Sequence, residues 1–348
     1  MNPKRSPAKT SAKTLSPTWR TQLSDHVIGL CWHPSGKSVA VATVDGHVAL
    51  IDAEDGHTIW HKSIHRVGAA DLHLSANGER LVSAGHDGVA RLLATHSGDV
   101  LAELPGGASW VERASVSPSG ELILLGAGNH VRLFGCSGEL LLSLPDAPFT
   151  VSDIAWFHHD PCFAVLTYGV LRVFVPSASA PVQSYEWKGS MLKLAVSPNG
   201  RYLATGNQDC SVHLFLTGTT KDLEMSGYPA KVRLLSWDHQ SRLLATGGGA
   251  ACCVWDFGGK GPAGSRPVTL SASRSMLSAL AFQHQGDLLA SGNVDGTLAL
   301  WLPTQDEAVR AQGMLGTEIS QLAWSPDDRR LAAGCADGSV RCVSCALR

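Results

Sequence analysis

Cysteine and histidine are frequent enough in this chain to raise the question of a metal site. The sequence contains nine cysteines and 15 histidines. Two pairs are direct neighbours, whose side chains point to opposite faces of a strand: Cys252-Cys253 and His158-His159. Cys342 and Cys345 have the two-residue spacing of a zinc site but no second pair. We therefore expect no bound metal; a zinc site assembled from several parts of the chain is the alternative.

Catalytic motifs are also missing from the sequence. It contains no G-x-S-x-G nucleophile motif and no P-loop. Gly247-Gly248-Gly249 follows one strand pattern and enters another, so it lacks the helix N-terminus that binds phosphate. Serine, histidine and aspartate are abundant, but their spacing identifies no triad. We expect a protein without enzymatic activity and without a cofactor.

Composition limits the partners and the compartment. A net charge of −2 and an isoelectric point near 6.7 argue against bulk attraction to nucleic acid or anionic membrane. No apolar stretch approaches the roughly 18 residues of a membrane span. The cysteines lie mostly in strand patterns, and no secretory signal is visible, so we expect reduced thiols in the cytoplasm.

The strands that would position a functional site belong to a unit that is repeated along the chain. Each unit consists of an apolar run, a Pro/Gly turn, a second run, a tight turn that is often Asp-Gly, and a third run. The third runs end at Ile51, Leu93, Phe134, Phe174, Phe215, Trp255, Trp301 and Val343. Successive ends are 40 to 46 residues apart. This period predicts an all-β propeller array, in which each unit buries its faces against its neighbours.

Two copies of the repeat show its pattern well. One runs from Leu280-Ala281-Phe282 through Asp295-Gly296 to Trp301, and the other from Leu322-Ala323-Trp324 through Asp337-Gly338. Both resemble the WD40-repeat family, and the resemblance covers nearly all of the chain from residue 17 onward. It implies a closed β-propeller of four-stranded antiparallel blades. It also implies structural aspartates in the turn between the second and third strands: Asp45, Asp87, Asp209, Asp295 and Asp337.

Several positions depart from the family pattern. The third, fourth and sixth units lack the turn aspartate, and the fourth has only Tyr168-Gly169. The Gly-His dipeptide that opens many repeats is missing, with Asp25-His26 and His65-Arg66 as loose substitutes. These departures put the family's His-to-Asp hydrogen-bond network in doubt for this chain. The segment from Leu50 to Trp60 is instead similar to repeats of quinoprotein-like propellers, which implies an enzyme as the least favoured alternative.

The ends of the chain decide how the ring closes. A candidate outer strand follows each of the first seven units, but only five residues follow Val343. We therefore expect Thr18–Ser24 to complete the last blade, which closes the ring and removes exposed strand edges. This predicts eight blades in a single domain of residues 18–348, with seven blades as the alternative. Residues 1–17 carry four basic side chains, and we expect them to form a disordered basic tail.

Charged residues recur at one position of the innermost strand. In units two to five this position holds, in order, Asp71, Arg113, Asp153 and Lys193, whereas the other units are neutral there. Opposite charges on neighbouring blades predict interblade ion pairs across half of the channel mouth. The same side chains are also a candidate recognition strip, which Glu112 and Arg233, one position earlier in their strands, would extend.

Aromatic residues in the entry loops add to this strip. Trp110, Phe149 and Tyr228 precede the first strands of units three, four and six. Tryptophan, tyrosine and arginine are enriched at interaction hot spots. We therefore expect a monomeric scaffold propeller that binds protein partners at this rim as part of a complex. A metal- or ligand-handling propeller that uses cysteine and histidine is the alternative.

Overall fold

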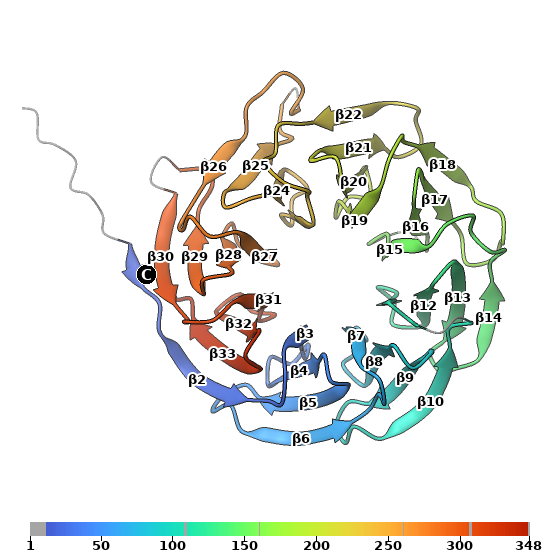
Figure 1. Cartoon of the computed structure of the whole chain (residues 1–348), viewed down its shortest axis with the longest axis horizontal. Coiled ribbons are helices and arrows are strands. Elements are labelled where there is room, and N and C mark those ends of the chain that lie inside the picture. The colour runs from blue at the N-terminus through green and yellow to red at the C-terminus, as the bar shows by residue number, and fades with distance from the viewer. Residues whose placement is uncertain (1–11, 108–109, 160, 260, 306–307, 347–348) are drawn as a thin grey trace, which may run out of the picture.

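The chain folds into a ring of eight β-sheets around a central axis (Figure 1). The computed structural model describes residues 12–107, 110–159, 161–259, 261–305 and 308–346. These residues form 33 strands, and no helix among them is long and apolar enough to cross a membrane. The expected eight-bladed propeller is confirmed, and the seven-bladed alternative is wrong.

Each blade has four antiparallel strands, called a to d from the axis outward. The a strands are β3 (Val27–Trp32), β7 (Ala69–Leu74), β11 (Arg113–Val116), β15 (Val151–Trp156), β19 (Met191–Val196), β23 (Leu234–Trp237), β27 (Leu277–Phe282) and β31 (Ile319–Trp324). The b strands are β4 (Ser38–Thr43), β8 (Arg80–Gly85), β12 (Leu122–Ala127), β16 (Phe163–Thr167), β20 (Tyr202–Asn207), β24 (Leu243–Gly247), β28 (Leu289–Asn293) and β32 (Arg330–Cys335). Blades are numbered one to eight in the order of these a strands.

The two outer strands of each blade follow the same order. The c strands are β5 (His47–Asp52), β9 (Val89–Ala94), β13 (His130–Gly135), β17 (Val170–Phe174), β21 (Val212–Leu216), β25 (Cys252–Asp256), β29 (Thr297–Trp301) and β33 (Ser339–Ser344). The d strands of blades one to seven are β6 (Thr58–Ser63), β10 (Val100–Pro105), β14 (Leu140–Ser143), β18 (Gln183–Glu186), β22 (Asp222–Met225), β26 (Val268–Leu270) and β30 (Val309–Met314). One d strand follows each of the first seven units, as expected from the sequence.

Blade eight receives its outer strand from the start of the chain. β2 (Pro17–Gln22) pairs antiparallel with β33, with Trp19 opposite Cys342. This is the closure that the sequence predicted. The structured chain begins earlier than the expected boundary at residue 17, because β1 (Lys13–Thr14) pairs parallel with β30 and Leu15 is buried. The expectation of a disordered tail is therefore wrong for residues 13–17, and residues 1–11 lie outside the described residues.

The core lies between blades rather than within them. Side chains of β4 and β16 are buried along their whole length, because neighbouring blades cover both faces of these strands. Eight apolar clusters form the core, and each is shared by two adjacent blades. The apolar runs of the repeat therefore bury their side chains only when the ring is assembled.

Tryptophans join the blades near the axis. In four blades the last residue of strand a donates its indole N–H to a strand-a carbonyl of the preceding blade. The donor and acceptor pairs are Trp32 to Ala323 (2.8 Å), Trp156 to Ser115 (3.3 Å), Trp237 to Ala195 (3.4 Å) and Trp324 to Ala281 (2.9 Å). Each such bond satisfies a buried polar group and holds the spacing between two blades.

Tryptophans also join blades at the outer edge. Trp19 of blade eight donates its indole N–H to Ala53 of blade one at 3.1 Å, and its ring covers Gly56. Gly56 has a φ of +81°, and a Cβ there would lie 2.7 Å from the ring, so only glycine fits. Trp60 of blade one forms the same contact with Thr95 of blade two at 2.9 Å.

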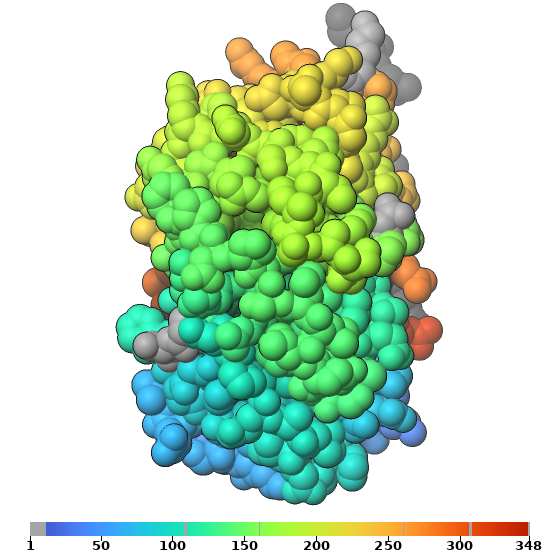
Figure 2. Space-filling view, turned by 90° about the vertical axis from the view of Figure 1, so that its right-hand side faces the viewer, coloured from blue at the N-terminus to red at the C-terminus, as the bar shows by residue number. Residues whose placement is uncertain are grey.

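The antiparallel order places the loops on two faces of the disc, which Figure 2 shows edge-on. Each a strand begins after a d–a connection and each c strand after a b–c turn, so both kinds of loop lie on the same side of the disc. We call this side the channel-mouth face. The a–b and c–d turns lie at the other ends of the strands and form the opposite face.

The joint between blades eight and one gives a stability prediction. Replacing the buried Trp19 in Trp19→Ala should lower the free energy of unfolding by about 3–5 kcal/mol, because a large buried ring and its hydrogen bond are lost. Trp110→Ala, at a ring that is 56% exposed, should change it by less than about 1 kcal/mol. Urea unfolding followed by fluorescence measures both. Equal effects of the two substitutions would contradict the proposed joint.

Candidate functional site

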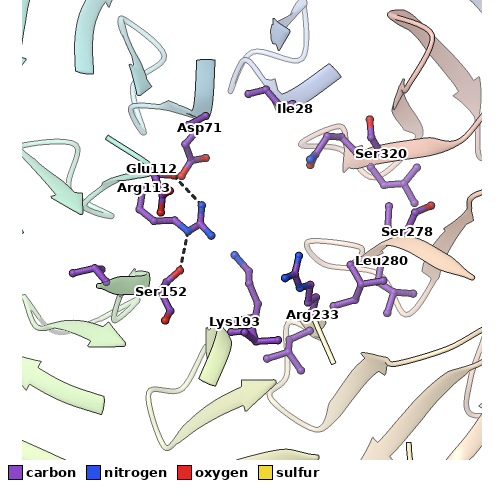
Figure 3. Close-up of a pocket in the computed structure, with 18 of the residues that line it drawn as sticks. Ile28, Asp71, Glu112, Arg113, Ser152, Lys193, Arg233, Ser278, Leu280 and Ser320 are labelled. Atoms are coloured by element: carbon purple, nitrogen blue, oxygen red, sulfur yellow. Dashed lines mark hydrogen bonds between the residues drawn. The ribbon is translucent and has the colours of Figure 1, made fainter. Parts of the chain in front are cut away.

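The first residues of the a strands surround a cavity of about 640 Å³ at the mouth of the central channel. The charged residues that line it come from blades two, three, five and six and include all of the expected strip except Asp153, which is buried behind the lining. Blades seven, eight and one contribute neutral residues such as Ser278, Ser320 and Ile28. Figure 3 shows the two halves facing each other, with Arg113, Lys193 and Arg233 directed into the opening.

Asp153 connects three blades in the charged half. Its buried carboxylate lies 3.4 Å from Arg113 Nε of blade three and 3.0 Å from Lys193 Nζ of blade five. It also accepts the backbone N–H of Leu194 at 2.9 Å. The interblade ion pairs expected from the sequence are therefore present around Asp153. Because both cations hold this carboxylate, part of their role is structural.

Asp71 is held differently from Asp153. Its carboxylate accepts the N–H of Ala114 in blade three at 3.1 Å and lies 3.3 Å from His73 Nε2. No ion pair joins Asp71 to Arg113 in the described part of the chain. The alternating chain of ion pairs is thus broken between blades two and three, because the Arg113 guanidinium turns toward blade four and donates to Ser152 O at 3.0 Å.

Two charged side chains of the mouth have no partner. Among the described residues, neither the Arg233 guanidinium nor the Glu112 carboxylate forms a hydrogen bond or an ion pair. Arg233 is exposed, and Glu112 is half-buried. These two groups, on blades six and three, are the charges of the mouth that are available to a ligand.

Two of the three expected aromatic anchors are exposed on the channel-mouth face. Trp110 is 56% exposed and packs against His86, with ring centroids 5.3 Å apart. Phe149 is 50% exposed and lies edge-on to Tyr168 at 5.3 Å. Tyr168, itself 52% exposed, was not among the expected residues. The sequence did offer a signal for this residue. The turn of unit four consists only of Tyr168-Gly169, without the aspartate that holds this turn in most other units.

Tyr228 does not belong to this surface, so that expectation is wrong. The ring is buried in blade six, where its hydroxyl lies 2.7 Å from Thr246 Oγ1 and accepts the indole N–H of Trp255 at 2.8 Å. Burial raises the pKa of this phenol well above its ordinary value. The entry-loop position alone did not reveal that this side chain turns inward.

The turn aspartates hold their turns in different ways. Four accept backbone N–H groups: Asp45 from His47 (3.4 Å), Asp87 from Arg66 (3.3 Å), Asp295 from Thr297 (3.0 Å) and Asp337 from Ser339 (2.9 Å). Asp209 instead accepts the Ser211 hydroxyl at 2.6 Å.

Blade two contains the His-to-Asp network that the sequence had put in doubt. Nδ1 of the buried His65 lies 2.9 Å from Asp87, and Nε2 lies 3.0 Å from Ser83 Oγ. Arg91 donates to the same carboxylate at 2.7 Å. His65-Arg66 is thus a working substitute for the missing dipeptide, at least in this blade.

One group of possible metal ligands occurs among the described residues, on a c–d turn of the opposite face. Ligand atoms of Asp52, Asp55 and His57 lie within 4.8 Å of one another. The turn itself explains this arrangement, because Asp52 accepts the N–H of Glu54 at 2.7 Å and Asp55 accepts that of His57 at 2.9 Å.

The two-residue cysteine pair lies elsewhere, in blade eight. Burial raises the pKa of Cys342 to about 11 and that of Cys345 to about 12, which keeps both thiols neutral. A thiolate ligand would first have to lose its proton, so the two buried thiols are poorly prepared for a metal.

Asp153 provides a stability prediction at the channel mouth. Asp153→Ala leaves Arg113 and Lys193 without their counter-ion and the Leu194 N–H without an acceptor, so we expect a loss of about 3 kcal/mol in the free energy of unfolding. Asp99→Ala, which breaks an exposed pair with Lys62, should change the free energy of unfolding much less. Urea unfolding of both variants tests the difference; similar losses would refute an interblade role of Asp153.

Asp71 and His73 make stability depend on pH. Burial disfavours the charged carboxylate, yet His73 and the Ala114 N–H hold the pKa of Asp71 at about 2, below the ordinary 3.8. Burial also opposes charge on His73, but Asp71 raises its pKa above 6.5. The lowered aspartate pKa stabilises the fold above pH 3.8, and this effect is lost as the pH falls toward 2. The raised histidine pKa stabilises below pH 6.5 and is lost as the pH rises through the folded value.

We therefore expect Asp71→Asn to destabilise the protein most between pH 3.8 and 6.5, where both groups are charged. The difference in free energy of unfolding between wild type and variant should shrink on either side of this window. Urea unfolding at a series of pH values measures it. A difference that does not vary with pH would show that the charge pair contributes nothing.

Family comparisons agree with this architecture. Residues 14–69 and 280–346 match the family described as the anaphase-promoting complex subunit 4 WD40 domain. Residues 180–215 match the WD domain, G-beta repeat. The first match joins the two ends of the chain, which lie side by side where the ring closes.

Similar proteins match parts of the chain. WD repeat-containing protein srw1 of Schizosaccharomyces pombe is 25% identical over 218 residues, covering 57% of this chain and 38% of srw1. Coronin-7 of Rattus norvegicus is 31% identical over 172 residues, covering 47% of this chain and 18% of coronin-7. Protein hir1 of Schizosaccharomyces pombe is 26% identical over 183 residues, covering 45% of this chain and 19% of hir1. The chain thus spans less than two fifths of the length of each of these relatives.

A solved structure supports the fold alone. The computationally designed Ika8 protein superposes with a TM-score of 0.81 at 19% identity, covering 94% of this chain and 99% of that one. Together, the repeat pattern, the eight four-stranded blades and the partial family matches support the WD40-repeat β-propellers as the family that this chain resembles.

Proposed function

We propose that this propeller is a non-enzymatic scaffold that binds protein partners through its channel-mouth face. The observation that carries the proposal is the combination of unpaired charge and exposed aromatic rings on this one face. Arg233 has no partner among the described residues, and Trp110 and Phe149 are about half exposed in nearby entry loops. Aromatic and arginine side chains of this kind dominate the binding energy of protein interfaces.

The construction of the ring supports a scaffold role. Hydrogen bonds and apolar clusters join every blade to its neighbours, so loops on the channel-mouth face sit on a stiff support. The family match to a domain named after a subunit of the anaphase-promoting complex favours a role within an assembly. The eight cysteines other than Cys162 are free thiols in the described part of the chain, which fits a reducing compartment such as the cytoplasm.

The structure guides the choice of test variants. Arg113 and Lys193 are poor choices because both hold the buried Asp153. Arg233→Glu, Trp110→Ala and Phe149→Ala change exposed side chains instead, and Arg329→Glu is a matched control in an exposed a–b turn of the opposite face.

We expect partners captured from native extract by the wild type and by Arg329→Glu to be lost or reduced with the three channel-mouth variants. Each hot-spot substitution should weaken the dissociation constant of the captured partner by about fivefold or more, as measured by calorimetry. Partners that survive all three changes but are lost with Arg329→Glu would move the interface to the opposite face. Capture of no partner by the wild type would refute the scaffold proposal.

A further inference from the structure

A basic side chain recurs two residues before the end of the third repeat run in five blades. The members are Arg91, Arg132, Arg172, His213 and Arg341. Four of them have a partner at or near the blade edge. Arg91 pairs with Asp87 and Glu103, Arg132 donates to Pro105 O, His213 contacts Asp222, and Arg341 donates to Leu315 O.

Arg172 of blade four is the exception. Its guanidinium forms no hydrogen bond or ion pair with any described residue. Blade two shows why: there Arg91 reaches the turn aspartate Asp87 and the cross-strand Glu103. In blade four the turn is Tyr168-Gly169, and the residue opposite Arg172 is Ser184. Both acidic partners are replaced, which leaves the half-buried Arg172 side chain unpaired within the part of the chain that the structure describes.

The structure is hollow beside this arginine. A cavity of about 180 Å³ lies between the end of β14 and blade four, and prolines and apolar side chains form most of its wall, among them Pro145, Pro148, Pro181 and Phe174. Its acidic wall residue, Asp146, is already bonded to His130 at 2.8 Å. Arg132 donates a hydrogen bond to Pro105 O of the preceding blade. At Arg172 this cavity lies where the corresponding contact would form.

A second, more open cavity of about 760 Å³ continues from the first toward the channel-mouth face. Arg172 and Pro148 line both cavities, so the two form one groove along blade four, called here the blade-four groove. The outer part is lined by the exposed Phe149 and Tyr168 and by Trp187, whose buried indole N–H also has no acceptor. Glu186 and Lys188 are the exposed charges at its rim.

We propose that the blade-four groove binds a peptide segment of a partner in which a carboxylate side chain lies next to a proline or an aliphatic residue. The carboxylate pairs with Arg172, whose planar fork suits a bidentate contact, and the apolar side chain enters the proline-lined cavity. This inference rests on the proposed function, because it gives the chemistry of one segment of the bound partner.

The basic N-terminal residues of this chain do not fit the groove. They carry the same sign of charge as Arg172. The described chain also starts at β1 on blade seven, across the ring from β17 (Figure 1). A separate molecule with an acidic segment is therefore the occupant that complements the site.

Selection of random short peptides displayed on phage, with the full chain as bait, tests the groove directly. We expect enriched sequences that combine aspartate or glutamate with proline or aliphatic residues. Synthetic copies should bind Arg172→Glu about tenfold or more weakly than wild type, with partial recovery in Arg172→Lys. Ser179→Trp, which fills the small cavity without touching the charge, should also weaken binding. Arg66→Glu, at an exposed arginine side chain without a partner on blade two, should not.

A thermal unfolding midpoint equal to that of the wild type confirms that each variant is folded. Enriched peptides without acidic residues, peptides that bind Arg172→Glu as well as wild type, or no enrichment would overturn the groove proposal. Peptides unaffected by Arg172→Glu but lost with Arg233→Glu or Trp110→Ala would overturn it while supporting the scaffold proposal. A wild-type dimer that Arg172→Glu dissociates in analytical ultracentrifugation would identify a second copy as the occupant and reject the peptide.

Discussion

The pairing of β2 with β33 is the constraint on which the rest of the ring depends. The N-terminal segment touches three blades: β1 extends blade seven, β2 completes blade eight, and Trp19 packs on blade one. Arg330 strengthens the same seam by donating to Ala53 O and Gly36 O of blade one, with its guanidinium 4.9 Å from the Trp32 ring. Because each blade is stable only against its neighbours, opening this seam would expose two apolar faces.

Charge in the channel follows from this closed geometry. The a strands converge on the axis, so an acidic side chain of one blade reaches the backbone of the next. Asp71 and Asp153 both use this reach, accepting the N–H of Ala114 and of Leu194. The same carboxylates organise the basic side chains around them, whereas Arg233 and Glu112 stay unpaired among the described residues of the mouth. Structural pairing and surface recognition thus share one set of side chains.

Blade four illustrates how loss of a repeat feature can create a surface. Where the turn aspartate is kept, as in blades two and eight, the arginine of strand c pairs within its own blade. Where it is replaced by Tyr168-Gly169, Arg172 pairs with none of the described residues, and an aromatic side chain is exposed beside it. The departure from the family pattern, rather than the pattern itself, marks the groove.

The sequence alone determined the class of architecture, since eight units 40 to 46 residues apart and the missing last outer strand favour an eight-bladed ring closed by residues near Thr18, which the structure confirms. It also placed Asp71, Arg113, Asp153 and Lys193 around the mouth, because equivalent positions of a repeat must lie at one level of the channel. Only the tertiary structure decided that Tyr228 is buried, that Arg113 turns to Asp153 rather than Asp71, and that Arg172 pairs with no described residue. Strand periodicity specifies which positions neighbour one another, whereas side-chain direction and pairing depend on contacts between blades that no local pattern encodes.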